Sequence, residues 1–417
     1  MGKYFTRAQW KIFMGIFLGY TAAYVARLNM SAALPALMES MNLTAAQGGL
    51  FQTGFALIYA TGQLVNGALV DKVSAKKYIF IGMIGSALCN VLAGCAQSFG
   101  VLMFAWCMNG VTQSMLWTPI VKLMAIWFRG KRRRRVGFGA TMTLVGGNML
   151  AWAISGVLSS MFTWRLSFLI PAAVIGGVGI LTLFLLKDRP SEKEACEIME
   201  GEELSDTEAR PEDPVRIMPL GKLFFGTGLA LILVSCVTNG FVRDGIITWT
   251  PTIVSSLNTG VDSSLLIAVV IPLLNLCGIL LSSRLYEMVG GNSRRCIMLL
   301  MAVNAGLALL VLAGASSTVI CAVLLGLTCS ATYAINPVLT SLIPMEYERT
   351  GRVGLVAGVI DCFIYLGSSM AGIATGALSD AMGWNFVFIS WCLAALLGAA
   401  MVLLSMRFRK NLTKWGI

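Results

Sequence analysis

The sequence predicts an all-α membrane protein of about twelve transmembrane helices, arranged as two pseudo-symmetric bundles of six. Three observations predict this fold: a low content of charged residues, long apolar runs from end to end, and a repeat that links the two halves. Of the 417 residues, 57% are hydrophobic and 12% are charged, whereas a soluble domain has roughly 25% charged residues. The deficit indicates that lipid surrounds most of the chain.

Apolar runs of about 20 residues, the length that crosses a bilayer, recur along the whole chain. We place six spans near 12–37, 48–70, 78–97, 99–128, 137–160 and 165–186. Six more follow near 223–255, 263–286, 296–314, 318–343, 353–377 and 384–406. The predicted domains are therefore an N-terminal bundle in 1–186 and a C-terminal bundle in 222–417, joined by 187–221.

The connecting stretch 187–221 is rich in Glu, Asp and Pro and has little apolar surface to bury. We interpret it as a solvated cytoplasmic linker, and the alternative is a regulatory docking segment. Basic residues cluster in alternate short loops, above all in the run 129–135, and Arg165 is the one basic residue in the predicted outside loops. This bias predicts a plasma-membrane protein with both termini in the cytoplasm.

The internal repeat is weak but consistent in its spacing. Arg27 and Arg243 are 216 positions apart, as are Asp71 and Glu287. A longer motif recurs 220 positions on: Gly156-x-Leu158-Ser159-x4-Trp164-x3-Phe168 becomes Gly376-x-Leu378-Ser379-x4-Trp384-x3-Phe388. Transporters built from two parallel halves bind cargo near the bilayer midplane and alternate access by rocking. The repeat predicts that Arg27 and Arg243 lie on opposite walls of such a site.

Charged residues inside spans are costly and usually functional. Arg27 and Arg243 present fixed forks of donors that match phosphate or carboxylate oxygens, so we interpret them as an anion-binding pair. The alternative is that intramembrane acids neutralise both for structural reasons. The candidate acids are Asp244, which should point about 100° away from Arg243 around the helix, and Asp361, which is either a coupling site or a counter-charge.

Aromatic and loop residues complete the candidate set. Tyr20 and Tyr24 lie on the helical face of Arg27, and Tyr365 follows Asp361 by four residues. The stretch Gly67 to Lys77, with Asp71, Lys72, Lys76 and Lys77, follows the second span, and Glu287 follows the eighth. A carboxylate beside basic residues at a helix end can hold neighbouring helices together in one conformation and release them in the other, so we interpret these residues as a gate. The alternative is that they are charged surface residues exposed to solvent.

Other functional classes are excluded by composition. The sequence has no His, no nucleotide-binding loop and no metal-ligand cluster, and its eleven Cys lie mostly in apolar runs as small hydrophobes. We therefore expect no enzyme activity, no metal and no cofactor. We interpret the net charge of +11 as a determinant of orientation in the membrane and not as a sign of nucleic-acid binding. The expected partners are a small anionic substrate and the lipid bilayer, with the chain functional as a monomer.

The segments GYTAAYVARLNMSAALP, RDGIITWTPT and Gly67–Lys77 resemble the major facilitator superfamily, and more narrowly its organophosphate:phosphate antiporters, over nearly the whole chain. The resemblance implies that Arg27 and Arg243 bind substrate phosphate and that Tyr20, Tyr24 and Tyr365 line the cavity. Glycerol-3-phosphate transporters have a cavity Lys where this chain has Gln63. They have a His at Thr143, an acid at Thr248 and a small residue at Asp361. The cavity thus loses one cation and gains one anion.

These features together predict a secondary active transporter of a small organic anion, working by alternating access. The leading cargo is an organophosphate such as glycerol-3-phosphate, exchanged for phosphate. One alternative is a proton-coupled symporter of an organic acid, which Asp361 favours. The other is a transporter-like sensor that binds an anion and signals through a partner docked on 187–221.

Overall fold

The computed structural model of the chain describes residues 5–69, 73–128, 130–200, 218–256, 271–314, 318–347 and 353–408. These residues form helices joined by short connections, and no strand occurs among them. Twelve helices of 18 residues or more lie within the described ranges, which confirms the predicted fold class. Eight of the described helices are long and apolar enough to cross a membrane.

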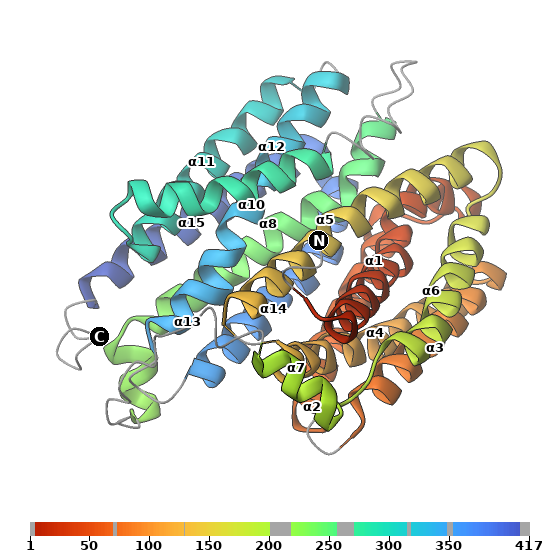
Figure 1. The fold of residues 1–417 in the computed structure, drawn as a ribbon. Coiled ribbons are helices and arrows are strands. Elements are labelled where there is room, and N and C mark those ends of the chain that lie inside the picture. The colour runs from red at the N-terminus through yellow and green to blue at the C-terminus, as the bar shows by residue number, and fades with distance from the viewer. Residues whose placement is uncertain are drawn as a thin grey trace. The chain divides into compact units, whose positions relative to one another are not determined.

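Residue contacts divide the chain into two compact units. Unit 1 comprises Met1–Ala36 and Ile58–Arg210, and unit 2 comprises Leu37–Leu57 and Pro211–Ile417. The first six long helices are α1 (Arg7–Met41), α2 (Ala45–Leu69), α3 (Ala75–Cys95), α4 (Phe99–Trp127), α5 (Gly130–Met161) and α6 (Leu166–Leu185), followed by the short α7 (Glu192–Glu200). The others are α8 (Leu229–Ser256), α10 (Ile271–Met288), α11 (Ser293–Gly314), α12 (Thr318–Pro337), α14 (Val353–Met382) and α15 (Trp384–Ser405), with the single turn α13 (Ile343–Met345), as Figure 1 shows.

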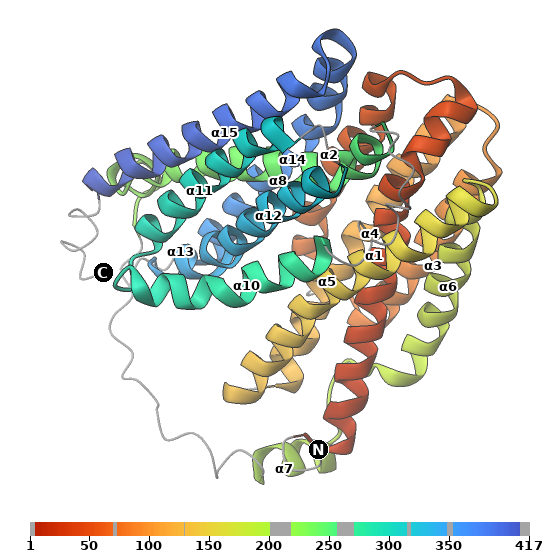
Figure 2. The same ribbon diagram turned by 90° about the horizontal axis from the view of Figure 1, so that it is seen from above.

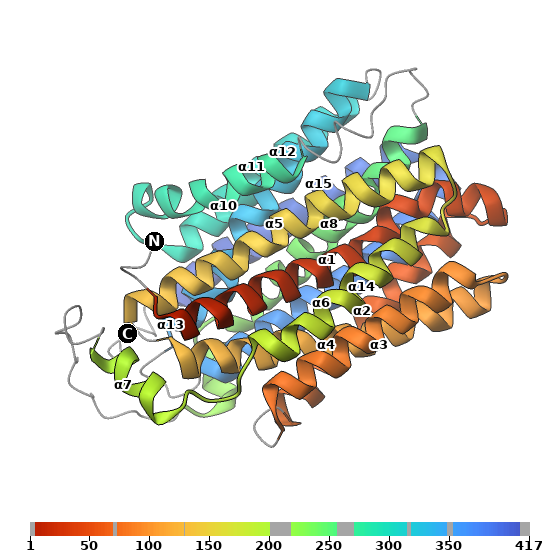
Figure 3. The same cartoon turned by 45° about the vertical axis from the view of Figure 1, so that its right-hand side comes forward.

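In unit 1, helices α1, α3, α4 and α6 lie side by side (Figure 3). Buried amides on α3 and α4 hold α1 in place. Asn90 of α3 and Asn109 of α4 both donate to the carbonyl oxygen of Ala26, each at 3.1 Å. Gln113 of α4 donates to the carbonyl oxygen of Ala23 at 3.0 Å. A buried polar group must be hydrogen-bonded to avoid a desolvation cost, so these bonds fix the depth and rotation of α1 immediately beside Arg27.

Residues 187–200 form the first part of the predicted linker, and most of them are exposed, but a few of their side chains contact the helices of unit 1. The indole nitrogen of Trp127 donates to the carbonyl oxygen of Lys187 at 2.9 Å. Asp188 accepts hydrogen bonds from Ser74 Oγ (2.5 Å) and the Lys76 backbone nitrogen (2.9 Å) at the start of α3. Ile198 of α7 is only 7% exposed and joins the core of unit 1. Figure 2 shows α7 beside the first turn of α1. Residues 201–217 lie outside the described residues.

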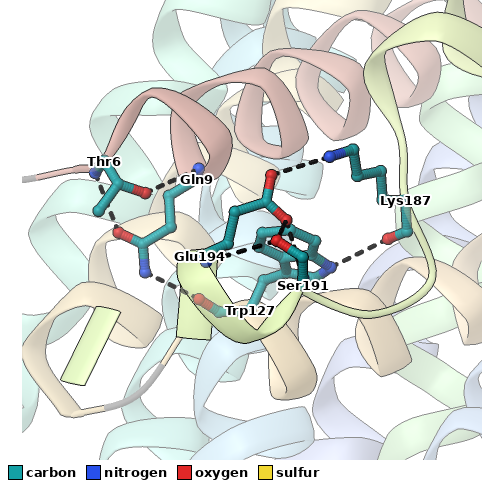
Figure 4. A network of polar contacts seen from close by, with 6 residues as sticks. All are labelled: Thr6, Gln9, Trp127, Lys187, Ser191 and Glu194. Carbon is teal, nitrogen blue, oxygen red and sulfur yellow. Dashed lines mark hydrogen bonds and ion pairs between the residues drawn. The ribbon is translucent and has the colours of Figure 1, made fainter. Parts of the chain in front are cut away.

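The start of α7 is a capping box. Ser191 Oγ accepts from the Glu194 backbone nitrogen at 3.4 Å, and Glu194 accepts in return from the Ser191 backbone nitrogen at 2.9 Å. Lys187 Nζ lies 2.8 Å from Glu194 Oε1 (Figure 4), and this hydrogen bond holds the pKa of Glu194 below its usual range. Because the folded-state pKa is lowered, the ion pair is present at neutral pH and is lost as pH falls through that lowered value.

Unit 2 contains a close contact between the first half of α2 and α14, built on glycines. A Cβ atom placed on Gly372 would overlap the Gly49 carbonyl oxygen and lie 2.8 Å from Thr53 Oγ1. Thr53 donates to the Ser369 carbonyl oxygen at 2.7 Å. Asp380 accepts hydrogen bonds from the backbone nitrogens of Ala45 and Ala46, at 3.0 and 2.7 Å, and so caps the N-terminus of α2.

Gly372→Ala is expected to destabilise this contact by about 1–3 kcal/mol, the usual cost of overpacking. The added methyl group meets backbone on the facing helix, which cannot move aside as a side chain tip does. Gly358→Ala is the matched control on the same helix, because a Cβ atom there meets nothing within 4 Å. Thermal unfolding of the purified variants, followed by tryptophan fluorescence, measures the difference. Equal unfolding temperatures for the two variants would contradict the glycine contact.

Candidate functional site

Unit 1 presents a half-site centred on Arg27, in the middle of α1. The guanidinium carbon of Arg27 lies 4.4 Å from the centroid of the Tyr59 ring and 5.9 Å from that of Tyr24. Tyr59 is 1% exposed and Arg27 is half-buried. A guanidinium over an aromatic face is held by cation–π attraction, so the two rings help to orient the Arg27 side chain.

Polar and aromatic neighbours extend this half-site along α2 and α4. Gln63 Nε2 donates to the Tyr59 hydroxyl at 2.8 Å, and Gln63 Oε1 accepts from Thr118 Oγ1 at 3.1 Å. The Tyr20 ring stacks on Trp117, with the centroids 5.0 Å apart, and it meets Tyr24 edge-on at 5.1 Å. These interactions preset the orientation of the groups around Arg27.

Four of the predicted binding residues, Tyr20, Tyr24, Arg27 and Gln63, are therefore connected through direct contacts in unit 1. Sequence reasoning missed Tyr59, although its position four residues before Gln63 puts both on one face of α2. It also missed the partners on α4, Trp117 and Thr118, which no spacing rule connects to α1 or α2.

Unit 2 presents a second half-site around Arg243 of α8. Arg243 Nε lies 2.8 Å from Asp244 Oδ1, and a terminal nitrogen donates to Asp244 Oδ2 at 3.1 Å. The other terminal nitrogen donates to Asn336 Oδ1 of α12 at 3.1 Å. Ser368 of α14 donates to Asp244 Oδ2. The side chains of Arg243 and Asp244 are 14% and 12% exposed, so the pair is largely shielded from solvent.

The expectation that Asp244 would point away from Arg243 was wrong. Consecutive helical side chains do leave the backbone about 100° apart, but the long Arg243 side chain folds back and meets the carboxylate with two donors. Such a bidentate geometry is the preferred one for an arginine and a carboxylate. Asp244 is therefore the direct counter-charge of Arg243, and Ser368 holds the carboxylate in place.

Asp361 differs from Asp244 in its surroundings. It lies in the first third of α14, and it is exposed. The described residues offer its carboxylate no hydrogen bond and no ion pair within 4.0 Å, although Arg243 and Cys236 of α8 lie within its electrostatic reach. Tyr365, one turn further on, and Tyr333 of α12 both interact electrostatically with Arg243. The acid and the two tyrosines thus border the same part of α8.

The predicted gating residues are placed only in part. Asp71 and Lys72 lie outside the described residues, while Gly67 is in the last turns of α2 and Lys76 and Lys77 are in the first turn of α3. Asp188 is the carboxylate that contacts the start of α3 among the described residues. Glu287 is exposed near the end of α10. At two of the four positions where the resemblance places other residues, Thr143 and Thr248 are buried.

Comparison with known proteins identifies related chains. A family model described as Major Facilitator Superfamily matches residues 16–353. The membrane sensor protein UhpC of Salmonella typhimurium is 29% identical over 182 residues, which cover 43% of this chain and 40% of that protein. The phosphoglycerate transporter protein of the same organism is 32% identical over 181 residues, 42% of this chain and 39% of that protein. The glycerol-3-phosphate transporter of Bacillus subtilis is 26% identical over 195 residues, 46% of this chain and 44% of that protein.

Each of these matches spans less than half of the relative's length. None of the three relatives is named as an enzyme. A solved structure of a bacterial homologue of the human lysosomal transporter Spinster, inward-facing and unoccupied, has a TM-score of 0.72 at 15% identity. That likeness covers 99% of this chain and 96% of the other, and it concerns the fold alone.

Proposed function

We propose that this chain, which belongs to the Major Facilitator Superfamily, is a secondary active transporter of a small organic anion. The leading cargo is an organophosphate exchanged for inorganic phosphate. Relatives at 32% and 26% identity are named as phosphoglycerate and glycerol-3-phosphate transporters, which supports this choice of anion.

The observation that carries the proposal is the setting of Arg27. Its guanidinium sits on the Tyr59 ring at mid-span, with Gln63 hydrogen-bonded to the same tyrosine. An arginine at this depth costs about 2.5–3.5 kcal/mol on insertion scales. Binding a phosphate or carboxylate through two parallel hydrogen bonds offsets that cost and uses the geometry that distinguishes arginine from lysine.

The chain is a multi-pass membrane protein, and we place both termini in the cytoplasm because the run 129–135 and most other basic residues fall in loops on one side. Transport then proceeds by alternating access, with the two halves rocking about the bound substrate. The chain works as a monomer in this scheme.

Counterflow in proteoliposomes tests the function directly. Vesicles containing the purified protein are loaded with phosphate and offered labelled glycerol-3-phosphate outside, at two pH values. Uptake that depends on internal phosphate is the expected result. The absence of both uptake and binding of any organic anion by the intact protein would contradict the proposal, and tight binding without flux would indicate an anion sensor instead.

A second candidate function is proton-coupled symport of an organic acid. The exposed carboxylate of Asp361 in the first third of α14 favours it, because such a group can bind a proton in one conformation and release it in another. The same vesicles separate the two functions. Uptake that needs no internal phosphate but strengthens with an inward proton gradient identifies the symporter.

A further inference from the structure

Unit 2 has an open pocket of about 610 Å³ where α10 ends, α11 begins and α15 ends. Small-molecule sites in proteins have volumes of about 300–1,000 Å³, so the pocket has room for a polar group with part of an apolar chain. Its lining is mostly apolar and includes Val289, Met298, Leu299, Leu403 and Met406. Among the described residues that line the pocket, Arg295 is the charged one. The two half-sites around Arg27 and Arg243 use none of these residues.

Two arginines give the pocket a positive charge. The exposed guanidinium of Arg295 has no hydrogen-bond or ion-pair partner among the described residues. Arg294, the preceding residue, is 1% exposed and donates to the carbonyl oxygens of Ser405 and Thr227. Carbonyl oxygens have no net charge, and no carboxylate of the described residues lies within 4.0 Å of Arg294. Because Ser405 directly precedes Met406 of the lining, this buried charge lies beside the pocket.

The other charged residues around the pocket offset one another. They are Glu287 in the last turn of α10 and Arg407 in the single turn η6 (Met406–Phe408), and both are exposed. Three arginines against one glutamate leave the described residues of these helix ends with a net charge of about +2. Charges within the Debye length of about 8 Å interact without much screening by salt. An anion is therefore attracted to this pocket.

The apolar lining continues along the outer surface of α11 and α15, which lie side by side (Figure 2). These helices give the most apolar of the eight candidate spans, each with a mean hydropathy of 2.5. Leu299 and Val303, one turn apart on α11, are exposed, as are Leu396 and Leu403, two turns apart on α15. Exposed apolar side chains on a membrane-spanning helix contact lipid chains. The pocket thus connects a lipid-facing surface to the arginines at the helix ends.

We propose that this pocket binds an anionic phospholipid, with the phosphate at Arg295 and one acyl chain along the exposed surface of α11 and α15. Basic pockets between spanning helices on the cytoplasmic side bind anionic lipid headgroups, and this end of unit 2 is cytoplasmic in the orientation proposed above. A free phosphate ion matches the same arginines, but it leaves the apolar lining without a partner. The lipid site goes beyond the proposed transport function and does not depend on the cargo.

Native mass spectrometry of the purified full-length protein tests the site, because it resolves single bound lipid molecules. The probes are dioleoyl phosphatidylglycerol and dioleoyl phosphatidylcholine, which have the same chains and differ in the charge of the headgroup. We expect the wild-type protein to bind its first phosphatidylglycerol molecule at least fivefold more tightly than phosphatidylcholine. Arg295→Gln should weaken phosphatidylglycerol binding about fivefold, which is roughly the contribution of one basic residue near an anionic membrane surface.

Two variants should retain the preference for phosphatidylglycerol. Arg295→Lys keeps the positive charge, and lysine also binds a phosphate group as a point charge. Arg7→Gln is the matched control, because it removes an exposed arginine from the first turn of α1 in unit 1.

The outcomes separate the lipid site from its alternatives. Equal affinity of the wild-type protein for the two lipids overturns the proposal, and this comparison needs no variant. An unchanged preference in a folded Arg295→Gln protein overturns the assignment to this pocket. Displacement of bound phosphatidylglycerol by inorganic phosphate, but not by sodium chloride at equal ionic strength, overturns the lipid in favour of a soluble anion. Because transport is not measured, a protein that binds phosphatidylglycerol as expected but transports no anion supports the site and contradicts the proposed function alone.

Discussion

Arg27→Lys is expected to lower transport at limiting substrate by roughly 30- to 4,000-fold. Removing the partner of a desolvated, hydrogen-bonded charge costs about 2–5 kcal/mol, and each 1.4 kcal/mol is a factor of ten. Lysine keeps the positive charge and the attraction to the Tyr59 ring, 4.4 Å away in the native protein, but it loses the planar fork that meets two anion oxygens at once. Initial uptake rates in proteoliposomes of equal protein content measure the change.

The control for this prediction is Arg295→Lys, at an exposed position in the first turn of α11. It makes the same chemical change away from both half-sites and should leave the rate within about twofold, as expected for surface substitutions. Equal amounts of both variants in the membrane fraction exclude an insertion defect. Transport by Arg27→Lys at the control rate would refute the role of the guanidinium fork.

The half-site of unit 1 was largely predictable because its members follow local rules. Tyr20, Tyr24 and Arg27 share a helix face through their spacing, and an arginine inside an apolar run is conspicuous in any sequence. Tyr59 was hidden for the opposite reason. A tyrosine in an apolar span is ordinary, and this one becomes a candidate only through its contact with Arg27 of another helix.

The half-site of unit 2 shows a different limit of sequence reasoning. The separation of 100° between neighbours describes where side chains start, and it predicted that Asp244 would not reach Arg243. Side-chain length and burial decided otherwise, because a shielded arginine gains more from two short hydrogen bonds than it loses in rotamer freedom. The contributions of Asn336 and Ser368 depend on how α8 packs against α12 and α14.

The segment 187–200 illustrates a third limit. Its composition is that of a solvated linker. Composition is an average over the segment, so it does not reveal the few residues that contact other helices. Ile198 and Asp188 attach this segment to the helices of unit 1, the first through burial and the second through hydrogen bonds at the start of α3. Their partners come from distant helix ends, which no local pattern reveals.

The ion pair in unit 2 leads to the second large expected effect. Asp244→Asn should destabilise the protein by about 3–5 kcal/mol, because it leaves the shielded guanidinium of Arg243 without its carboxylate. Asp361→Asn is the matched control, since that carboxylate is exposed and makes no ion pair with a described residue. Thermal unfolding in detergent distinguishes them, and an Asp244→Asn protein as stable as Asp361→Asn would contradict the pairing.

The double variant Arg243→Gln/Asp244→Asn then separates structure from transport. Removing both charges together should recover most of the lost stability, because neutral amides can replace the ion pair without leaving a buried charge. If transport stays absent in this stable protein, Arg243 binds the substrate in addition to pairing with Asp244. The ion pair between Arg243 and Asp244 must then loosen during the transport cycle. If transport returns, the pair is structural, and the anion is held by Arg27 alone. We expect the first result, because Arg243 stands at the repeat-related position of Arg27, 216 residues on.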